Sequence, residues 1–553
     1  MTERVAEPGA ATWLGFVLMC VGMFMAILDI QVVATSLPAI QDALAISRDA
    51  MSWIQTAYLI AEIIAIPLTG WFTRVLTLRW LFVIAISLFT LASIGCAFSG
   101  NFPTLVSFRV LQGFAGGALI PAVFSAVFLL FPIRLHPIAT TMAGIMAVLA
   151  PTVGPVVGGW ITETYSWHWL FLINVAPGVV AAAATPFLLP NDRPRFANLP
   201  TLDGYSLTLM AISLASLEIA LKQAPHDGWL SPLCALLFAL SAAAATAFVV
   251  RTLTATYPVV ELSTLKNRSF AIGCALSFCL GVGLFGSVYL MPVFLAYVRR
   301  HDAFEIGTIM LVTGVAQLVA APIAGSLESR LDPRWLSAAG FGLFTLGLGC
   351  SAFQSRIADF DEMFWPQVLR GVAIMFCLLP PTRLALGALT EAQVPDASGL
   401  FNLMRNLGGA IGIALIDTIL YGRTGGHAEA LRDRLTAGDI TAARAIGLDL
   451  ELFTHRPPDV SDATVEAYVR PMVEKAAFAL STNEAWALLA CAALLGLLLA
   501  PLAGRPPQSA DADEHKDHSA DAEQTLAAAG LARPTTLTPN PLTTTRLPPA
   551  PSS

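Results

Sequence analysis

The feature that most constrains this chain is its series of apolar runs, each about as long as a helix that crosses a bilayer. Of the 553 residues, 56% are hydrophobic and only 12% are charged, whereas soluble domains carry about 25% charged residues. The sequence therefore predicts an all-α integral membrane protein with fourteen spans. The predicted spans are approximately 13–37, 53–72, 79–98, 103–130, 138–161, 169–189, 204–222, 231–250, 270–297, 305–327, 335–353, 363–388, 397–421 and 483–502.

The second half of the chain repeats motifs of the first half at a nearly constant spacing. Three positions recur 255 residues later, Pro67 as Pro322, Gly70 as Gly325 and Arg79 as Arg334. Arg109 and Gln112 recur 258 residues later as Gln367 and Arg370, with the two residue types exchanged. Such repeats are typical of transporters that bind substrate near the midplane, between the repeats. We therefore expect two pseudo-symmetric six-helix bundles, 13–189 and 269–502, separated by two inserted helices in 190–268.

The distribution of Lys and Arg predicts the orientation of the chain in the membrane. If the N-terminus is cytoplasmic, the cytoplasmic loops carry eleven of these residues and the short opposite loops five, which favours cytoplasmic termini. The pair Arg299-Arg300 is a local exception. Residues 1–12 then form a cytoplasmic N-terminus, 422–482 an outer loop, and 503–553, rich in Pro and Thr, a disordered cytoplasmic tail. The first apolar run has no cleavage site and contains Asp29, so we expect it to remain as a span.

Charged residues inside the apolar runs are the first candidates for function. An arginine at the bilayer centre costs roughly 2.5–3.5 kcal/mol on insertion scales, so such residues are rare and usually functional. Arg109 and Gln112 are three residues apart and share a helix face. Asp29 in the first span must pair, exchange a proton or face a water-filled cavity. We expect Asp29, Glu62 and Arg109 to couple transport to protons or cations, although a static anchor at Asp29 and a structural hydrogen bond at Glu62 are open alternatives.

Other polar and aromatic residues in the spans are candidates for lining a substrate cavity. Gln55, Tyr58 and Glu62 are spaced to lie on one face of the second span. An aromatic stripe in the ninth span is more often helix packing than a cavity lining, and Arg405 has an alternative role as an anchor at the inner mouth. The full set of candidate lining residues is Gln55, Tyr58, Phe285, Tyr289, Arg370, Asn402, Arg405 and Asn406.

The fifth span contains a ridge of small residues with two prolines. Ala150, Gly154 and Gly158 recur every four residues, which allows close helix approach, and Pro151 and Pro155 favour a bend. Packing of this ridge is expected to restrict leakage while the halves rock.

Several function classes are not supported by the sequence. It contains no P-loop, HExxH or GxSxG motif and no paired metal ligands, so we expect no enzyme activity, no cofactor and no metal. Nothing indicates nucleic-acid binding. The eight cysteines all fall in apolar runs without a CxxC pair, as expected of buried free thiols.

Several motifs together resemble a known family, the fourteen-span drug:proton antiporters of the major facilitator superfamily, EmrB/QacA type. The resemblance covers roughly residues 13–421 and, more loosely, the last span. Its motifs are Leu28-Asp29 with Leu37-Pro38 in the first span, Arg109-Val110-Leu111-Gln112-Gly113 in the fourth, Gly154-Pro155 with Gly158-Gly159 in the fifth, and the segment from Trp167 to Asn174 followed by Pro177-Gly178.

The resemblance implies export of small amphipathic drugs or toxic compounds in exchange for protons, across a bacterial cytoplasmic (inner) membrane. It also implies a role in antibiotic resistance and, as a candidate partner, a periplasmic adaptor with an outer-membrane channel. Loop 422–482 is a candidate docking segment, although a bare loop is the simpler interpretation. The alternatives are a proton-coupled transporter of one metabolite or siderophore-like compound and, less favoured, a membrane-embedded enzyme or receptor.

One motif departs from the family pattern. The loop after the second span usually reads G-x-x-x-D-R-x-G-R, and in the family it helps to latch the inner gate. Here Gly70 begins a segment that contains Arg74 and Arg79 but lacks the acid, and Thr77 takes the place of the turn glycine. Gating is therefore expected to use other contacts or to be looser.

Overall fold

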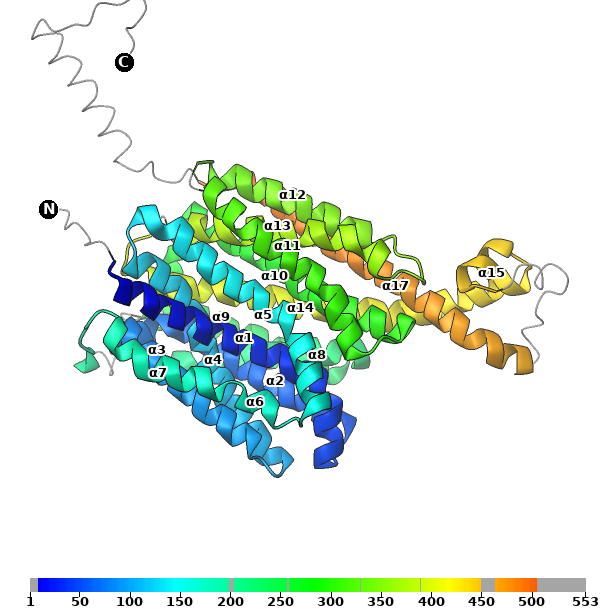
Figure 1. Ribbon diagram of the computed structural model, residues 1–553, viewed down its shortest axis with the longest axis horizontal. Helices are drawn as coiled ribbons and strands as arrows, with labels where there is room; N and C mark the ends of the chain where they lie inside the picture. The colour runs from blue at the N-terminus through cyan, green and yellow to red at the C-terminus, as the bar shows by residue number, and fades with distance from the viewer. Residues whose placement is uncertain are drawn as a thin grey trace, which may run out of the picture. The chain divides into compact units, whose positions relative to one another are not determined.

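The computed structural model describes residues 8–197, 203–255, 258–328, 330–387, 389–448 and 463–504. Within these ranges every regular element is helical (Figure 1). A helix satisfies its own backbone hydrogen bonds, which a chain in hydrocarbon requires. The predicted all-α class is therefore confirmed. The predicted disorder of the tail falls almost entirely outside the described residues.

The first half of the chain forms a bundle around an apolar core that includes Phe16, Phe82, Phe124 and Phe171 and continues into the second half at Phe270 and Phe401. A short 3-10 turn, Ile66–Leu68, joins its second and third helices. The helices of this bundle are α1 (Ala10–Leu44), α2 (Arg48–Ala65), α3 (Thr69–Ala97), α4 (Phe102–Leu130), α5 (His136–Thr164), α6 (Trp169–Leu172) and α7 (Val175–Leu188).

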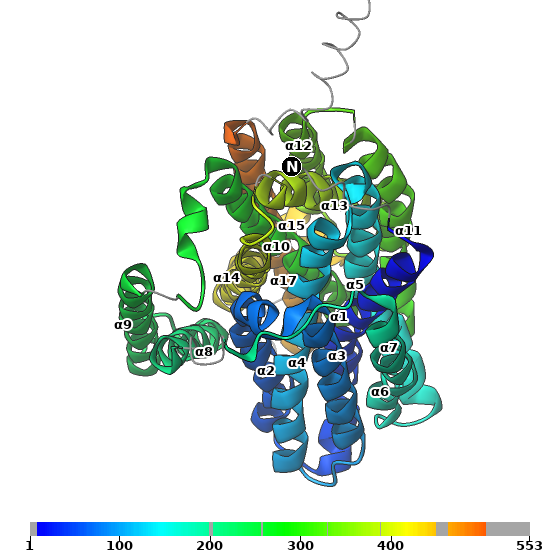
Figure 2. The same cartoon turned by 90° about the vertical axis from the view of Figure 1, so that its left-hand side faces the viewer.

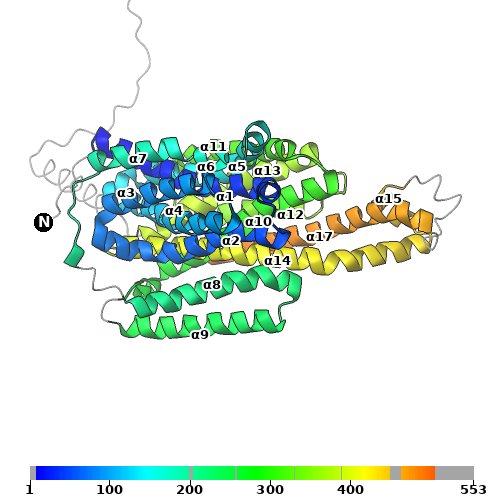
Figure 3. The same ribbon diagram turned by 90° about the horizontal axis from the view of Figure 1, so that it is seen from below.

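Two inserted helices, α8 (Gly204–Asp227) and α9 (Pro232–Thr254), lie side by side along one flank (Figure 3). Side chains cap both N-termini, because Asp203 accepts from two backbone N–H groups of α8 and Ser231 accepts from one of α9. The helix α8 packs on α2 and α14, whereas most of α9 is exposed. An exposed apolar helix of this kind suits contact with lipid chains.

The second half forms a bundle with its own core, which includes Phe294, Phe341, Phe344 and Trp486. Seen along the helices, α5 of the first half lies next to α11 of the second (Figure 2). The helices of the second half are α10 (Arg268–Phe294), α11 (Ala303–Glu328), α12 (Pro333–Ser351), α13 (Phe360–Leu386), α14 (Val394–Thr436), α15 (Ile440–Ile446) and α17 (Ala463–Leu499).

The helix boundaries agree with most predicted spans. By length and composition, twelve stretches of the described residues are long and apolar enough to cross a membrane. One of them, Met51–Ala97, combines the predicted spans 53–72 and 79–98. Its helix is interrupted at Thr77, which has φ 71° and ψ 159°. The predicted span 335–353 corresponds to α12, which is not among the twelve.

The predicted outer loop 422–482 is helical over most of its described part. The helix α14 continues to Thr436, and α17 begins at Ala463, so both helices extend well past the predicted limits of their spans (Figures 1 and 3). With α15 they enclose a small apolar core of Leu431, Leu435, Ile446 and Val473 among others. The described part of this segment is therefore helical, because these residues bury apolar side chains on one another, whereas the choice between a docking segment and a bare loop stays a prediction.

The exceptional pair Arg299-Arg300 has a structural explanation. The guanidinium of Arg299 donates to Asp359 Oδ2 over 2.6 Å and 3.2 Å, and His301 Nε2 lies 3.1 Å from the same carboxylate. Partial burial alone would raise the pKa of Asp359, but hydrogen bonds from Arg299, from the Phe360 backbone and from His301 lower it. Arg300 has φ 63° and ends the helical turn after α10.

Candidate functional site

The residues Asp29, on α1, and Arg109, on α4, form an ion pair in the interior of the first bundle. Both side chains are fully buried, and Arg109 Nη1 donates to Asp29 Oδ2. A buried charge is tolerated only when it is paired and hydrogen-bonded. The structure thus brings together the two charged residues that the sequence nominated on separate spans.

Two neutral side chains also donate hydrogen bonds to the Asp29 carboxylate. Gln112 Nε2 and Asn174 Nδ2 each donate to Asp29 Oδ1 over 2.9 Å. Gln112 also donates to Ser93 Oγ over 2.8 Å and accepts from Arg109 over 2.7 Å. The contact from Asn174 was not predicted, although this asparagine ends the Trp167–Asn174 motif segment that directly precedes α7. One carboxylate thereby connects α1, α4 and the start of α7.

The guanidinium of Arg109 is held by groups on α2 as well. Its Nε donates to the Ile54 carbonyl over 3.2 Å, and its Cζ lies 4.3 Å from the ring centroid of Tyr58. A desolvated cation–π contact is worth about 2 kcal/mol. Arg109 Nη2 has no hydrogen-bond partner among the described residues. The close approach of α2 and α4 requires Gly113, because a Cβ there would overlap the Tyr58 carbonyl oxygen.

The predicted residues of the second span lie in different surroundings. Tyr58 is fully buried and donates to the Ala26 carbonyl over 3.1 Å, so it is part of the ion-pair cluster and does not line a cavity in this conformation. Gln55 is half-buried. Glu62 is almost fully buried on α2, and the charged side chains that act on it most strongly are Glu218, on the inserted helix α8, and Arg109.

In the second half, Arg370 on α13 occupies the interior without a carboxylate. Within the described residues its Nη2 donates to Met291 Sδ over 3.4 Å, and its Nε and Nη1 have no partner. Its Cζ lies 4.6 Å from the Trp486 ring centroid. Gln367, the other member of the repeated pair, accepts from Thr313 Oγ1 over 3.0 Å. The two halves therefore repeat the helices but not the ion pair.

The remaining candidates for the cavity are dispersed over α10 and α14. Tyr289 donates to Asp417 Oδ1 over 2.7 Å, and Phe285 packs against Gly409. Arg405 lies over Phe124 of the first half, with Cζ 5.3 Å from the ring centroid. The structure does not bring these residues to one cavity. Asn402 is buried and donates to the Ser398 carbonyl, whereas Asn406 is half-buried.

The small-residue ridge of α5 faces α1, within the same half. A Cβ on Gly154 would overlap the Gln31 side chain, and Ser36 Oγ donates to the Gly158 carbonyl over 3.5 Å. Pro155 and Gly159 are buried beside it. The contact of α5 with the second half uses other residues, because Thr152 packs against Gly314 of α11 and Val156 against Gly307.

The two halves are joined on the predicted cytoplasmic side by an ion pair. Arg74 of α3 donates to Asp396, which lies in the first turn of α14 and is almost fully buried. Thr73 replaces the acid of the family motif in this segment, so the acid of this contact comes from the second half of the chain. Asp396 was missed because nothing in the local sequence marks it as a partner. Ser398 donates to the Pro121 carbonyl across the same contact over 2.8 Å.

The other arginine of this loop has a different role. Arg79 donates to the Pro186 and Asp192 carbonyls over 3.3 Å and to Asn191 Oδ1 over 2.7 Å. It therefore fixes the end of α7 to α3 within the first half.

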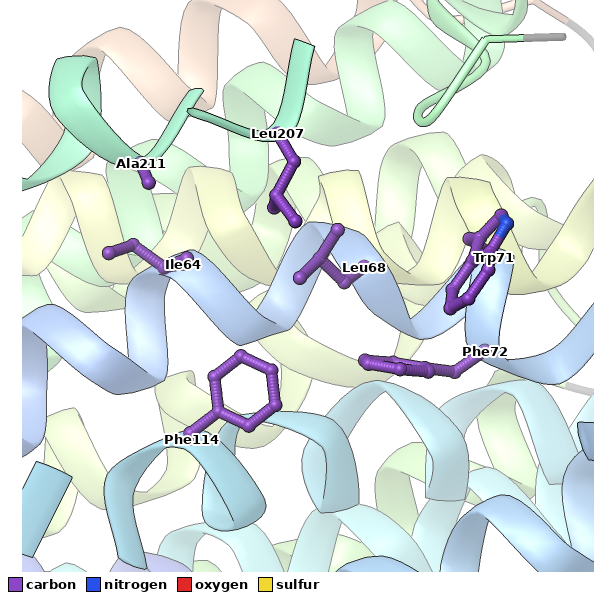
Figure 4. Close-up of a pocket in the computed structure, with 7 residues that line it drawn as sticks. All are labelled: Ile64, Leu68, Trp71, Phe72, Phe114, Leu207 and Ala211. Carbon is purple, nitrogen blue, oxygen red and sulfur yellow. The ribbon is translucent and has the colours of Figure 1, made fainter. Parts of the chain in front are cut away.

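An apolar pocket of about 290 Å³ lies between the inserted hairpin and the first half (Figure 4). Leu207 and Ala211 of α8 face Phe114 of α4 across it. The rest of its lining, also apolar, is Ile64, Leu68, Trp71 and Phe72.

Metal and disulfide chemistry have no visible basis in the described residues. No group of three His, Cys, Asp or Glu side chains there is arranged to hold a metal ion. All eight cysteines are free; Cys350 and Cys491 are exposed, whereas the other six are buried as predicted.

Comparison with known proteins agrees with this architecture. A model of the Major Facilitator Superfamily matches residues 19–413. The chain belongs to the major facilitator superfamily. It is 39% identical over 431 residues to the colistin resistance protein EmrB of Acinetobacter baumannii, covering 78% of this chain and 84% of that protein. It is 30% identical over 429 residues to the multidrug export protein EmrB of Escherichia coli K12, covering 77% and 84%.

A solved structure from the same superfamily has a similar fold. The proton:xylose symporter XylE bound to 6-bromo-6-deoxy-D-glucose aligns with a TM-score of 0.54 at 12% identity, covering 89% of this chain and 95% of that one. At this identity the likeness shows the fold alone. Superfamily members are transporters, and the chain is accordingly a multi-pass membrane protein.

Proposed function

We propose that this protein is a proton-coupled exporter of small amphipathic drugs or toxic compounds across a bacterial inner membrane. The observation that carries the proposal is the fully buried ion pair between Asp29 and Arg109. An intramembrane carboxylate paired to an arginine is a group on which protonation has a large structural effect. The names of the relatives, a colistin resistance protein and a multidrug export protein, support this class of cargo.

The contacts of Asp29 suggest how a proton would act. While Asp29 is ionised, it attracts Arg109 and accepts from Gln112 and Asn174, which holds α1, α4 and the start of α7 together. A proton on Asp29 removes the charge attraction and one acceptor site. The contact between these helices then weakens, which favours a rearrangement of the bundle. Glu62, in electrostatic contact with Arg109 and Glu218, is the second proposed coupling group.

We infer that the conformation described here is closed on the cytoplasmic side. The first turn of α14 packs against α3 and α4, with the Arg74–Asp396 pair and the Ser398 hydrogen bond across the contact. Breaking these contacts is required for the halves to separate on that side. The proposed exchange of access is a rocking of 13–189 against 269–502.

The proposed arrangement has fourteen spans. The interruption at Thr77 divides Met51–Ala97 into two, and α12 adds one more to the twelve candidates. An even number places both termini on the same side of the membrane, and the Lys and Arg distribution favours the cytoplasmic side. The helices α8 and α9 are the two inserted spans of 190–268.

The segment 422–482, whose described parts are mostly helical, is the proposed contact for a periplasmic adaptor. As a helix α14 is roughly 65 Å long, about twice the thickness of a hydrocarbon core. The extension is therefore long enough to reach well beyond the membrane. Its two long helices are fastened by Arg423 and His427, which both contact Glu484.

The driving force can be tested with purified protein in vesicles. For a neutral cargo exchanged against one proton, a potential of 100 mV contributes about 2.3 kcal/mol, and one pH unit adds about 1.4 kcal/mol. We expect efflux of a lipophilic dye under an imposed gradient without ATP, and its collapse on addition of a protonophore. Transport that requires ATP while the gradient is intact would overturn the proposal. Export restricted to one metabolite in a panel of compounds would favour the narrower alternative.

A further inference from the structure

The interior of the second half contains a cation, Arg370, for which the described part of the chain supplies no anion. Arg370 is 2% exposed, and no carboxylate in the described part of the chain forms an ion pair with it. Two of its nitrogens, Nε and Nη1, have no hydrogen-bond partner there. A buried charge without a partner is strongly unfavourable. The face of Trp486 and the sulfur of Met291 compensate it only in part.

The internal repeat shows which group the second half lacks in its described residues, a carboxylate beside Arg370. Asp29 and Gln112 of the first half have Ser287 and Arg370 at the positions 258 residues later. In the first half the carboxylate of Asp29 accepts from both Arg109 and Gln112. At this spacing the residue that corresponds to Asp29 is a serine, and its hydroxyl donates to the Leu284 carbonyl over 3.0 Å. The same scaffold thus neutralises one arginine and leaves the other without an anion.

Arg370 also borders a cavity between the two halves. A small cavity of about 20 Å³ is lined by Arg370, Ser287 and Thr313 of the second half and by Thr152 of the first. Space of this size holds about one water molecule. Because α5 forms one wall and α10, α11 and α13 the others, separation of the halves widens this cavity.

We infer that Arg370 is the binding site for the negatively charged group of an anionic amphipathic cargo, such as an aromatic carboxylate. The inference rests on the proposed export function and names a substrate class for it. A carboxylate entering the widened cavity meets the N–H groups on Nε and Nη1 of Arg370, which have no partner among the described residues. Each of these groups can donate a charge-assisted hydrogen bond to a carboxylate oxygen. The cargo therefore supplies the charge that Asp29 supplies in the first half.

The test uses three probes of similar shape and different charge with the full-length protein in detergent. They are 2-naphthoate, which is anionic, 2-naphthalenemethanol, which is neutral, and 2-naphthylmethylammonium, which is cationic. We expect the wild type to bind 2-naphthoate at least tenfold more tightly than the alcohol. Equal affinities for the acid and the alcohol would overturn the inference without any variant.

Two variants change the site in opposite ways. Arg370→Gln removes the cation, and Ser287→Asp keeps the cation but supplies an internal carboxylate. Both are expected to weaken 2-naphthoate binding at least tenfold while leaving the alcohol within twofold, and Ser287→Asp should raise the thermal midpoint. Arg370→Gln leaves no carboxylate without its partner, so we expect it to fold. Arg423→Gln, an exposed charge change outside the site, is the matched control and should bind all three probes as the wild type does.

The outcomes separate this inference from the export function. Tight binding of 2-naphthoate by both variants would overturn the role of Arg370. The binding assay needs no proton gradient, so such a result would leave proton-driven export of other cargo standing. Loss of gradient-driven dye efflux in a wild type that still selects 2-naphthoate would instead overturn the export proposal.

Discussion

At the scale of single residues, the ion pair of Asp29 and Arg109 combines two requirements. It satisfies two charges that could not otherwise remain in the interior, and it places a group that can exchange a proton where three helices meet. Removing one member of a buried pair is strongly destabilising, whereas removing both charges is often nearly neutral. Single and double substitutions of Asp29 and Arg109 can therefore separate the effect of the pair on folding stability from its proposed role in proton coupling.

We expect Asp29→Asn and Arg109→Gln each to lower the free energy of unfolding by about 3–5 kcal/mol, because each leaves a buried group without its partner. The double variant should recover more than half of that loss, yet proton-driven transport should remain absent in all three. Denaturant unfolding in detergent and vesicle efflux measure the two quantities. A double variant that transports under a pH gradient would remove Asp29 from the proposed coupling.

Thr77 is a second residue whose conformation leads to a prediction. Its φ of 71° with ψ of 159° lies in a region that only glycine adopts without strain. Strain of this kind costs about 1–3 kcal/mol, and part of its relief is offset by the greater freedom of glycine in the unfolded chain. We expect Thr77→Gly to stabilise the protein by about 1 kcal/mol. The thermal midpoint measures this change, and Thr73→Gly, at a residue with helical backbone, is the control. Stabilisation by both variants or by neither would contradict backbone strain at Thr77.

At the scale of elements, α14 and α17 each combine a membrane helix with an extension. The inner part of α14 packs on the first half, and its outer part joins α15 and α17 around a separate apolar core. Thr424 and Ser481, joined by a hydrogen bond of 3.0 Å, mark where the two helices run together past the bundle. The extension can therefore be shortened without disturbing the interior.

We expect replacement of residues 428–477 by a short Gly/Ser linker to leave dye efflux in vesicles within about twofold of the wild type. If the extension binds an adaptor, the same variant should lose most of its drug resistance in cells with two membranes. Resistance and vesicle efflux are measured in parallel, with Arg434→Ala as a control that leaves the helices in place. Unchanged resistance would exclude adaptor docking on this segment, and failed vesicle efflux would show that the extension is needed for transport itself.

At the scale of the whole molecule, two similar bundles meet along α5 and α11 and are fastened at one end by Arg74 and Asp396. The ion pair between Arg74 and Asp396 joins the two halves. We therefore expect the attraction between its two charges to favour the conformation that is closed on that side. A change of 1.4 kcal/mol in that balance alters the population ratio tenfold.

We expect Arg74→Asp to open the cytoplasmic side, because two acids then face one another, and the double swap Arg74→Asp with Asp396→Arg to close it again. Ser398→Cys, in a background without the other cysteines, reports opening through its rate of alkylation, since Ser398 is buried in the same contact. The rate should rise about tenfold in the single variant and return in the swap. Equal rates in all three proteins would exclude this pair as a latch.

The sequence by itself determined the helical class, the repeat and the polar residues that cannot lie in lipid. Hydrophobic length and the energetic penalty on charge are local properties, so Asp29, Arg109 and Arg370 could be singled out without coordinates. The partners of buried charges are not local. The contact of Asn174 with Asp29, the contact of Asp396 with Arg74 and, within the described residues, the lack of an acid at Arg370 depend on which helices pack together. Only the tertiary structure decided them, because a buried polar group is satisfied by neighbours that are distant in sequence. It also decided how far α14 and α17 extend within the described part of 422–482, since the apolar side chains there are buried only when α14, α15 and α17 pack together.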